Sequence, residues 1–309
     1  MSCDRPARLH IVRVPVDQQL EDCSSMDDLI MINEPVIRLV GFVGVFTVMA
    51  VWELLAPRRE LQQSKSARWL NNIGLVIFNT ALLRLVFPLA AVGMAAETQL
   101  LGWGLFNVVD VPVWLAVVGS VVLLDAAIYL QHVMFHALPV FWRLHRVHHA
   151  DLDFDVTTGA RFHPIEILLS MLIKFAVILL LGPPLVAVVL FEVILNAMAM
   201  FNHSNIRLPD QLDRWLRLLV VTPDMHRVHH SHLDFEANSN FGFNLSIWDR
   251  LFGTYRAQPA DGHIGMVIGI DTFRDPAQCV RLQGMLVMPF AGRIRDYAIT
   301  RRIWKSPDE

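Results

Sequence analysis

Five apolar runs alternate with polar segments along the chain. They cover residues 36–55, 69–95, 112–136, 165–181 and 185–201. About 20 apolar residues in a helix cross the hydrocarbon core of a bilayer. The last two runs have 17 residues each, so a half-buried hairpin is an alternative to two full crossings. Gly182-Pro183-Pro184 between them is typical of a hairpin tip. The pattern predicts an all-α fold, a multi-pass transmembrane helical bundle.

The polar segments give the expected domain boundaries and topology. Residues 1–35 form an acid-rich N-terminal tail that we expect to be poorly ordered, and in which Met26 or Met31 is an alternative start. The tail lacks the basic start and apolar run of a signal peptide. Residues 36–111 hold the first two spans, 112–256 a histidine-rich domain, and 257–309 a C-terminal cytoplasmic extension. The basic loop 58–68 favours the cytoplasmic side, and this threading puts all histidine clusters on that face.

The chain after residue 208 is mostly soluble in character. Four apolar residues at helical spacing predict an amphipathic helix at the membrane interface; they are Leu212, Trp215, Leu216 and Leu219. The C-terminal end is basic, which suits anionic lipid headgroups or an acidic ferredoxin. Its basic residues are Arg281, Arg293, Arg295, Arg301, Arg302 and Lys305.

Composition supports a membrane protein. Hydrophobic residues make up 54% of the chain and charged residues 18%, and the mean hydropathy is positive. The formal net charge is -3 without a basic tract, so we expect no nucleic-acid partner. Cys3, Cys23 and Cys279 are scattered, which argues against a disulfide framework or a thiolate metal site.

Histidines carry the candidate chemistry. Residues three and four apart share a helix face, so each of three clusters presents its imidazoles in one direction. The motif His-Arg-Val-His-His occurs twice, 81 residues apart. Such clustering predicts bound metal, and imidazole suits iron, zinc, copper or nickel. The clusters are His132 and His136, then His145, His148 and His149, and then His226, His229 and His230.

Other polar residues near the clusters are expected to support or extend them. Asp125 and Tyr129 share a helical stripe with His132 and His136, and polar groups within a span need protein partners. We expect Asp125 and Tyr129 to fix ring N–H groups, with an ion pair to Arg84 as the alternative for Asp125. Nearby acids that could also accept from the rings are Asp151, Asp153, Asp155, Glu166, Asp224 and Asp234.

His163 and His203 flank the predicted hairpin on the clustered face, so each is a candidate ligand, with a supporting or interfacial role as the alternative. We expect His232 to support the site, and His10 and His263 to be surface residues.

These ordered motifs resemble the fatty acid hydroxylase and sterol desaturase superfamily, whose pattern is HxxxH, HxxHH, a separate histidine and a second HxxHH. Segments 141–149, 158–166, 240–242 and 248–255 also resemble its boxes, and the similarity covers roughly residues 120–256. One departure is Ala199, four residues before His203, where some members have a further histidine. His163 or Asn202 could replace that ligand.

The resemblance implies a membrane-bound, non-haem di-iron oxygenase. Two iron ions and O2 would hydroxylate or desaturate the C–H bond of a lipid, such as a sterol or fatty acyl chain. Because no haem or nucleotide motif occurs, electrons would come from an external ferredoxin or a cytochrome and reductase. The implied ligands are His132, His136, His145, His148, His149, His163, His203, His226, His229 and His230.

Two other functions remain open from the sequence. A di-zinc membrane hydrolase would also use imidazole ligands, although hydrolytic zinc sites usually keep an open position beside a carboxylate base. A non-catalytic metal-binding or lipid-binding membrane protein would bind without turnover.

Overall fold

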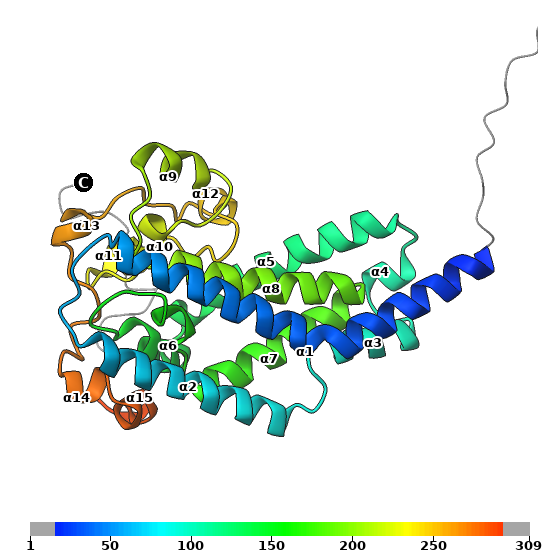
Figure 1. Cartoon of the computed structure of the whole chain (residues 1–309), viewed down its shortest axis with the longest axis horizontal. Coiled ribbons are helices and arrows are strands. Elements are labelled where there is room, and N and C mark those ends of the chain that lie inside the picture. The colour runs from blue at the N-terminus through cyan, green and yellow to red at the C-terminus, as the bar shows by residue number, and fades with distance from the viewer. Residues whose placement is uncertain (1–15, 293–309) are drawn as a thin grey trace, which may run out of the picture.

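Long helices run along the molecule, and short helices and loops gather at one end of it (Figure 1). The computed structural model describes residues 16–292, with side chains from residue 27 onward. Within this range β-structure is limited to isolated bridges. Five helical segments are long and apolar enough to cross a membrane. The prediction of an all-α, multi-pass membrane fold is therefore confirmed.

The helices follow the apolar runs with one interruption. The helices of the apolar runs are α1 (Val16–Leu55), α2 (Lys65–Val86), α3 (Ala91–Leu101), α5 (Val113–Ala137), α7 (Pro164–Leu181) and α8 (Leu185–Asn202), with the short α4 (Leu105–Val108) after α3. The predicted second run is divided between α2 and α3. Pro88 explains the break, because it has no backbone N–H to donate and disfavours helical geometry at Phe87.

The first helix begins earlier than the sequence pattern predicted. Residues 16–34 were expected to belong to a poorly ordered tail, but α1 starts at Val16. Glu34 accepts from Arg38 one turn later, at 2.6 Å, and Arg38 also contacts Glu192 of α8. Such pairs stabilise a helix without leaving an apolar signal in the sequence. Residues 1–15 lie outside the described part of the chain.

The predicted hairpin is present in α7 and α8. α7 ends at Gly182, whose backbone has a left-handed φ of 58°. A Cβ atom there would lie 2.4 Å from the Trp103 carbonyl oxygen, so the turn needs glycine for its conformation and for its close packing. α8 packs along α1 and against α5, which places the hairpin beside the histidine-bearing helix.

Short elements form a cap at one end of the long helices (Figure 1). They are α6 (Pro139–His149), η1 (Thr158–Ala160), α9 (Asp210–Leu216), α10 (Pro223–His229), α11 (Asp234–Ala237), α12 (Ile247–Leu251), α13 (Gly262–Gly265), α14 (Pro276–Cys279), α15 (Leu282–Val287) and η2 (Met288–Phe290). α9 is the predicted amphipathic helix, with Leu212 and Trp215 exposed; its place at a membrane interface stays a prediction. Of the basic C-terminal residues only Arg281 is described; Arg293, Arg295, Arg301, Arg302 and Lys305 lie outside the described residues.

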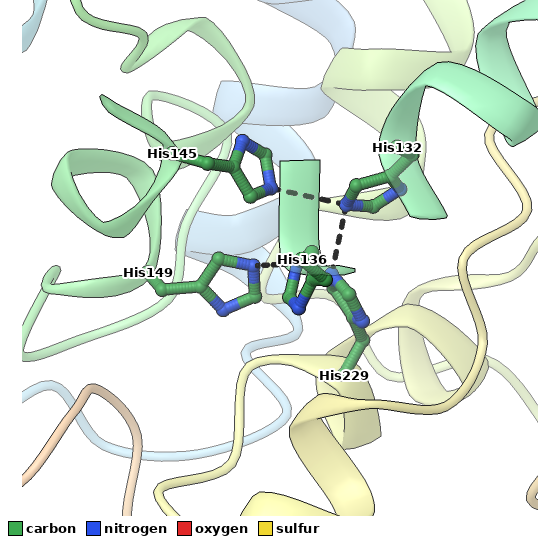
Figure 2. Close-up of side chains that lie close together, drawn as sticks. All are labelled: His132, His136, His145, His149 and His229. Atoms are coloured by element: carbon green, nitrogen blue, oxygen red, sulfur yellow. Dashed lines mark hydrogen bonds between the residues drawn. The ribbon is translucent and has the colours of Figure 1, made fainter. Parts of the chain in front are cut away.

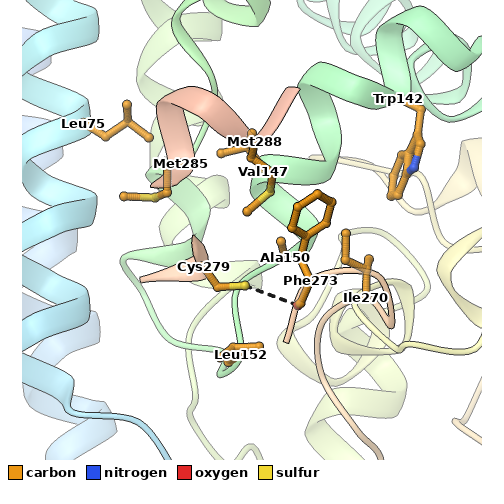
Figure 3. Packing of buried hydrophobic residues seen from close by; sticks show 10 residues of the cluster. All are labelled: Leu75, Trp142, Val147, Ala150, Leu152, Ile270, Phe273, Cys279, Met285 and Met288. Atoms are coloured by element: carbon orange, nitrogen blue, oxygen red, sulfur yellow. Dashed lines mark hydrogen bonds between the residues drawn. The ribbon is translucent and has the colours of Figure 1, made fainter. Parts of the chain in front are cut away.

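An apolar cluster packs against the back of α6 (Figure 3). Val147, which lies inside the first HxxHH box, meets Met285 and Met288 from the C-terminal elements and Leu75 from α2. Cys279 of the same cluster donates to the Phe273 carbonyl oxygen at 3.2 Å. Residues after position 270 thus support the helix that carries three of the clustered histidines.

Candidate metal centre

Nine buried histidines converge in two groups at the junction of the long helices and the cap. Group A consists of His132, His136, His145, His149 and His229, and group B consists of His148, His203, His226 and His230. Within each group the ligand atoms lie within 4.8 Å of one another. Figure 2 shows the group A rings pointing toward one another from α5, α6 and α10. The groups adjoin, since the rings of His149 and His230 stack with centroids 4.6 Å apart.

Backbone carbonyls fix which nitrogen of several rings faces inward. His132 Nδ1 lies 2.8 Å from the Phe241 oxygen, and His229 Nδ1 lies 2.7 Å from the Ser239 oxygen. A carbonyl only accepts, so each Nδ1 must carry the proton and each Nε2 must present a lone pair. The two Nε2 atoms are nevertheless 3.0 Å apart. Two lone pairs at this distance repel each other unless a cation lies beside both.

Group B repeats this arrangement at His203. Its Nδ1 donates to the Ala199 oxygen at 2.8 Å, and its Nε2 lies 3.1 Å from His148 Nε2 and 3.0 Å from His226 Nε2. Nitrogens bound at about 2.0–2.1 Å to one metal, with bonds at right angles, are about 3 Å apart. The ring spacings and the tautomers therefore fit a metal ion in each group.

Burial keeps the imidazoles in the state that metals bind. It lowers the pKa of His145 and of His203 to about 3, from an ordinary value of 6.5. Burial and neighbouring rings also lower the pKa of His149, His226 and His230 well below that value. These rings are neutral at physiological pH, as metal ligation requires.

The structure places His163, the tenth predicted ligand, outside both groups. Its Nδ1 accepts from the Ile165 backbone N–H and caps α7, and its Nε2 faces the Leu286 carbonyl oxygen at 3.3 Å. The Pro164 that follows favours this helix start, which explains the histidine without a metal. Asn202, the other suggested replacement ligand, donates to the Phe243 carbonyl oxygen.

Asp125 and Tyr129 support the site indirectly, through the 241–255 segment and not through ring N–H groups. Asp125 accepts from the backbone of Asn244 and Leu245 and from the Trp248 indole, at 3.3, 3.1 and 2.8 Å. The Tyr129 hydroxyl pairs with Thr254 at 2.8 Å. Both residues thus hold the 241–255 segment, whose Phe241 carbonyl orients His132. The described residues show no ion pair between Asp125 and Arg84.

The residue types at 240–242 suit the backbone conformation and the close packing of this segment. Asn240 has a φ of 52°, which asparagine tolerates better than most residues, and its side chain bonds the backbone of Met225 and Arg256. A Cβ on Gly242 would lie 2.6 Å from an Asp249 carboxylate oxygen. Asp249 accepts from the backbone of Phe241 and Gly242, at 2.7 and 2.9 Å, which fixes the carbonyl behind His132.

Of the acidic residues near the histidine boxes, some accept from imidazole rings and others form ion pairs with arginines. Glu166 accepts from His145 Nδ1 at 2.6 Å, as the sequence suggested. Asp151 instead binds the buried Arg68 through both oxygens, at 2.9 and 2.8 Å, and Asp155 binds it as well. The role of Arg68 was not predicted, because it lies in the basic loop region that the sequence assigned to topology alone. This ion network fixes the loop that follows α6.

A cavity of about 300 Å³ opens onto the metal centre. His132 and His145 of group A and His148 of group B belong to its lining. Its other walls are mostly apolar side chains of the membrane helices, among them Phe42, Leu83, Ile128, Phe135, Met171 and Leu195. A long apolar molecule entering from the bilayer would thus reach both histidine groups.

Comparisons with known proteins agree with this geometry. The fatty acid hydroxylase family model matches residues 117–254. The ornithine lipid hydroxylase OlsE of Rhizobium tropici is 28% identical over 226 residues, which are 71% of this chain and 67% of that protein. The alkylglycerol monooxygenases of Xenopus tropicalis and Homo sapiens are 26% and 29% identical over 65% and 48% of this chain. The matched regions span 45% and 32% of these two proteins, less than half of each. No solved structure matches the chain significantly.

Proposed function

Because this chain belongs to the fatty acid hydroxylase superfamily, we propose that it is a membrane-bound oxidoreductase that hydroxylates a lipid at a two-iron site. The observation that carries the proposal is the convergence of the two histidine groups at the end of an apolar cavity within the membrane helices. Its relatives are named a lipid hydroxylase and alkylglycerol monooxygenases, which favours hydroxylation over desaturation.

In this proposal the protein's own residues bind the metal ions and position the substrate. Five group A and four group B imidazoles would bind two iron ions, and two backbone carbonyls and Glu166 keep the Nε2 atoms of His132, His229 and His145 inward. Bound iron would supply the activation of O2 and the oxidation of an unreactive C–H bond. The apolar cavity walls would hold the alkyl chain beside the site and exclude water from it.

The overall reaction needs partners outside the chain. One oxygen atom of O2 enters the C–H bond and the other leaves as water, which consumes two electrons and two protons. We propose that the electrons come from a ferredoxin or from a cytochrome and its reductase. We place the site on the cytoplasmic side of the membrane because of the basic loop 58–68.

Metal analysis with an isotope assay tests the proposal. Purified full-length protein should contain iron at up to two ions per chain, matching the two groups. Supplied with a reductant and ¹⁸O2, it should place ¹⁸O in a lipid of the host membrane. Tightly bound zinc with O2-independent hydrolysis would instead identify a hydrolase. Bound metal without turnover, under any reductant, would identify a binding protein.

A further inference from the structure

The cavity beside the metal centre contains buried polar atoms that find no partner in the part of the chain that the structure describes. Asn79 and Gln131 both line it, and within residues 27–292 neither Asn79 Oδ1 nor Gln131 Oε1 has a hydrogen-bond partner, although both atoms are buried. A buried acceptor that is left unsatisfied costs about 1–3 kcal/mol. These two acceptors therefore point to a ligand that donates hydrogen bonds.

The Asn79 amide is fixed by its surroundings. Its Nδ2 donates to the Phe162 carbonyl oxygen at 2.8 Å, and a carbonyl only accepts, so Oδ1 must be the free atom. Asn79 is only 6% exposed. The Phe162 ring in turn stacks on His148 with centroids 4.5 Å apart. Asn79 thus presents an acceptor to the cavity and is linked through Phe162 to a ring of group B.

Gln131 presents the second acceptor next to group A. It directly precedes His132, and its Nε2 contacts Ser170 Oγ at 2.8 Å. Glu166, one turn before Ser170 on α7, lines the same end of the cavity and accepts from His145. The end of the cavity at the metal centre is therefore rich in acceptors.

The cationic side chains of the cavity lie away from its histidine end. Its lining contains two cations, Lys174 and Arg38, and both contact Glu192, at 2.7 and 3.1 Å. Lys174 lies eight residues beyond Glu166, which corresponds to about 12 Å along α7. Both side-chain cations are thus paired with Glu192 and lie away from the histidine end of the cavity, where Asn79 and Gln131 present their acceptor oxygens.

We infer that the substrate is a lipid with hydrogen-bond donors, amide N–H or hydroxyl groups, close to the carbon that is oxidised. Asn79 and Gln131 each accept from one such donor and position the neighbouring C–H bond, and the alkyl chain occupies the apolar part of the cavity. A plain ester or hydrocarbon chain satisfies neither acceptor. This inference rests on the proposed function and names the substrate class for the same site.

Three lipids that share one headgroup and one chain length test the inference. The first is amide-linked, the second is ester-linked, and the third is ester-linked with a hydroxyl next to the linkage. Iron-loaded full-length protein in nanodiscs, with reductant and O2, should show a higher kcat/KM for the amide or the hydroxyl lipid than for the plain ester. Asn79→Leu and Gln131→Met should each reduce that preference by roughly five- to tenfold, the worth of one hydrogen bond.

Thr80 offers a matched control. It lines the same cavity, but its hydroxyl already donates to the Val76 carbonyl oxygen at 2.8 Å. Thr80→Val should leave the preference unchanged. Iron content and the lipid-induced rise in Tm without reductant are measured for every variant, so that a loss of folding is separated from a loss of recognition. A variant that fails to fold lowers turnover of all three lipids together.

The outcomes separate this inference from the proposed function. If the wild type oxidises the plain ester as well as the other lipids, or if both variants keep its preference, water satisfies the acceptors and the inference is wrong while the oxygenase assignment stands. If the iron-loaded wild type oxidises none of the lipids, nor any lipid of the host membrane, the proposed function itself fails.

Discussion

The two His-Arg-Val-His-His boxes have identical sequences but serve the two metal groups in opposite order. In the first box, His145 and His149 belong to group A and His148 to group B. In the second box, His226 and His230 belong to group B, and His229 to group A. Each box therefore contributes to both groups, and the two boxes complement each other. A short repeat can thus build a two-metal site without a duplicated domain.

The two groups differ in how the rings are supported. In group A, three Nδ1 atoms have acceptors in the Phe241 and Ser239 carbonyls and in Glu166. In group B, His203 has such an acceptor, whereas the Nδ1 atoms of His148, His226 and His230 have no partner among the described residues, as is also true of His149 in group A. Such outer hydrogen bonds fix the ring and increase ligand basicity. Group A is therefore the more preorganised half of the centre.

The largest predicted effect comes from removing one ligand of each group. His229→Ala and His148→Ala should each lower activity by more than about 100-fold, because both groups act on one substrate. His148→Ala should retain one metal ion in group A, whereas His229→Ala should weaken the better supported group and lose more metal. Metal quantification and lipid oxidation assays check both results.

His232→Ala is the control for the ligand variants. His232 is partly exposed, contacts Asp271 at 3.0 Å and lies outside both groups. The His232→Ala variant should therefore leave metal content and activity unchanged. Full activity in either ligand variant would remove that residue from the metal centre.

The second prediction concerns the carboxylate that only group A possesses. Glu166→Gln keeps an oxygen acceptor for His145 Nδ1 but replaces the carboxyl group with a weaker amide acceptor, so group A should bind metal about tenfold more weakly. The effect is measured in a His148→Ala background by metal titration against a competing chelator. An equal loss in a His229→Ala background, where group B is intact, would contradict the assignment of Glu166 to group A.

The third prediction tests, in the wild-type protein, whether group A holds its metal more tightly than group B. A chelator should remove the two metals in separate steps, with group B emptied first at a concentration roughly tenfold lower, because most of its rings lack an outer partner. Metal content after dialysis against graded chelator provides the measurement. A single step that removes both ions together would show that the groups are equally held.

The sequence predicted those features that are local along the chain. Apolar runs identified the membrane helices, because burial in lipid needs long uninterrupted apolar segments. Spacing of three and four identified eight of the nine gathered histidines, and His203 followed from its place after the hairpin. The start of α1 was missed, because residues 16–34 continue the helix in a mostly polar sequence that lacks the apolar pattern of a span.

Partners far apart in the chain could not be predicted. Asp125 was expected to serve a ring, but its acceptor oxygens meet backbone N–H groups about 120 residues away. His163 was expected to be a ligand from its position beside a span. In the structure it caps α7, and sequence position alone does not distinguish a helix cap from a metal ligand. The division of each box between two groups likewise depends on how α5, α6 and α10 approach one another.

The smallest predicted effect concerns Asp125, which supports group A indirectly through the 241–255 segment. Asp125→Asn replaces one acceptor oxygen with an NH2 group that faces N–H donors of the 244–248 segment. This change should cost roughly 1–3 kcal/mol of stability. Since that segment leads back to the Phe241 carbonyl behind His132, activity should fall several-fold while both metals remain bound.

Trp248→Phe separates loss of one contact from loss of the whole support. It removes only the indole donor, at 2.8 Å, and keeps both backbone N–H groups on Asp125, so its effects on Tm and kcat should be smaller than those of Asp125→Asn. Because the support acts through Phe241 and His132, the Asp125 variant should lower the chelator concentration that empties group A and leave the concentration that empties group B unchanged. If both concentrations fall equally, Asp125 supports the cap as a whole and has no specific connection to His132.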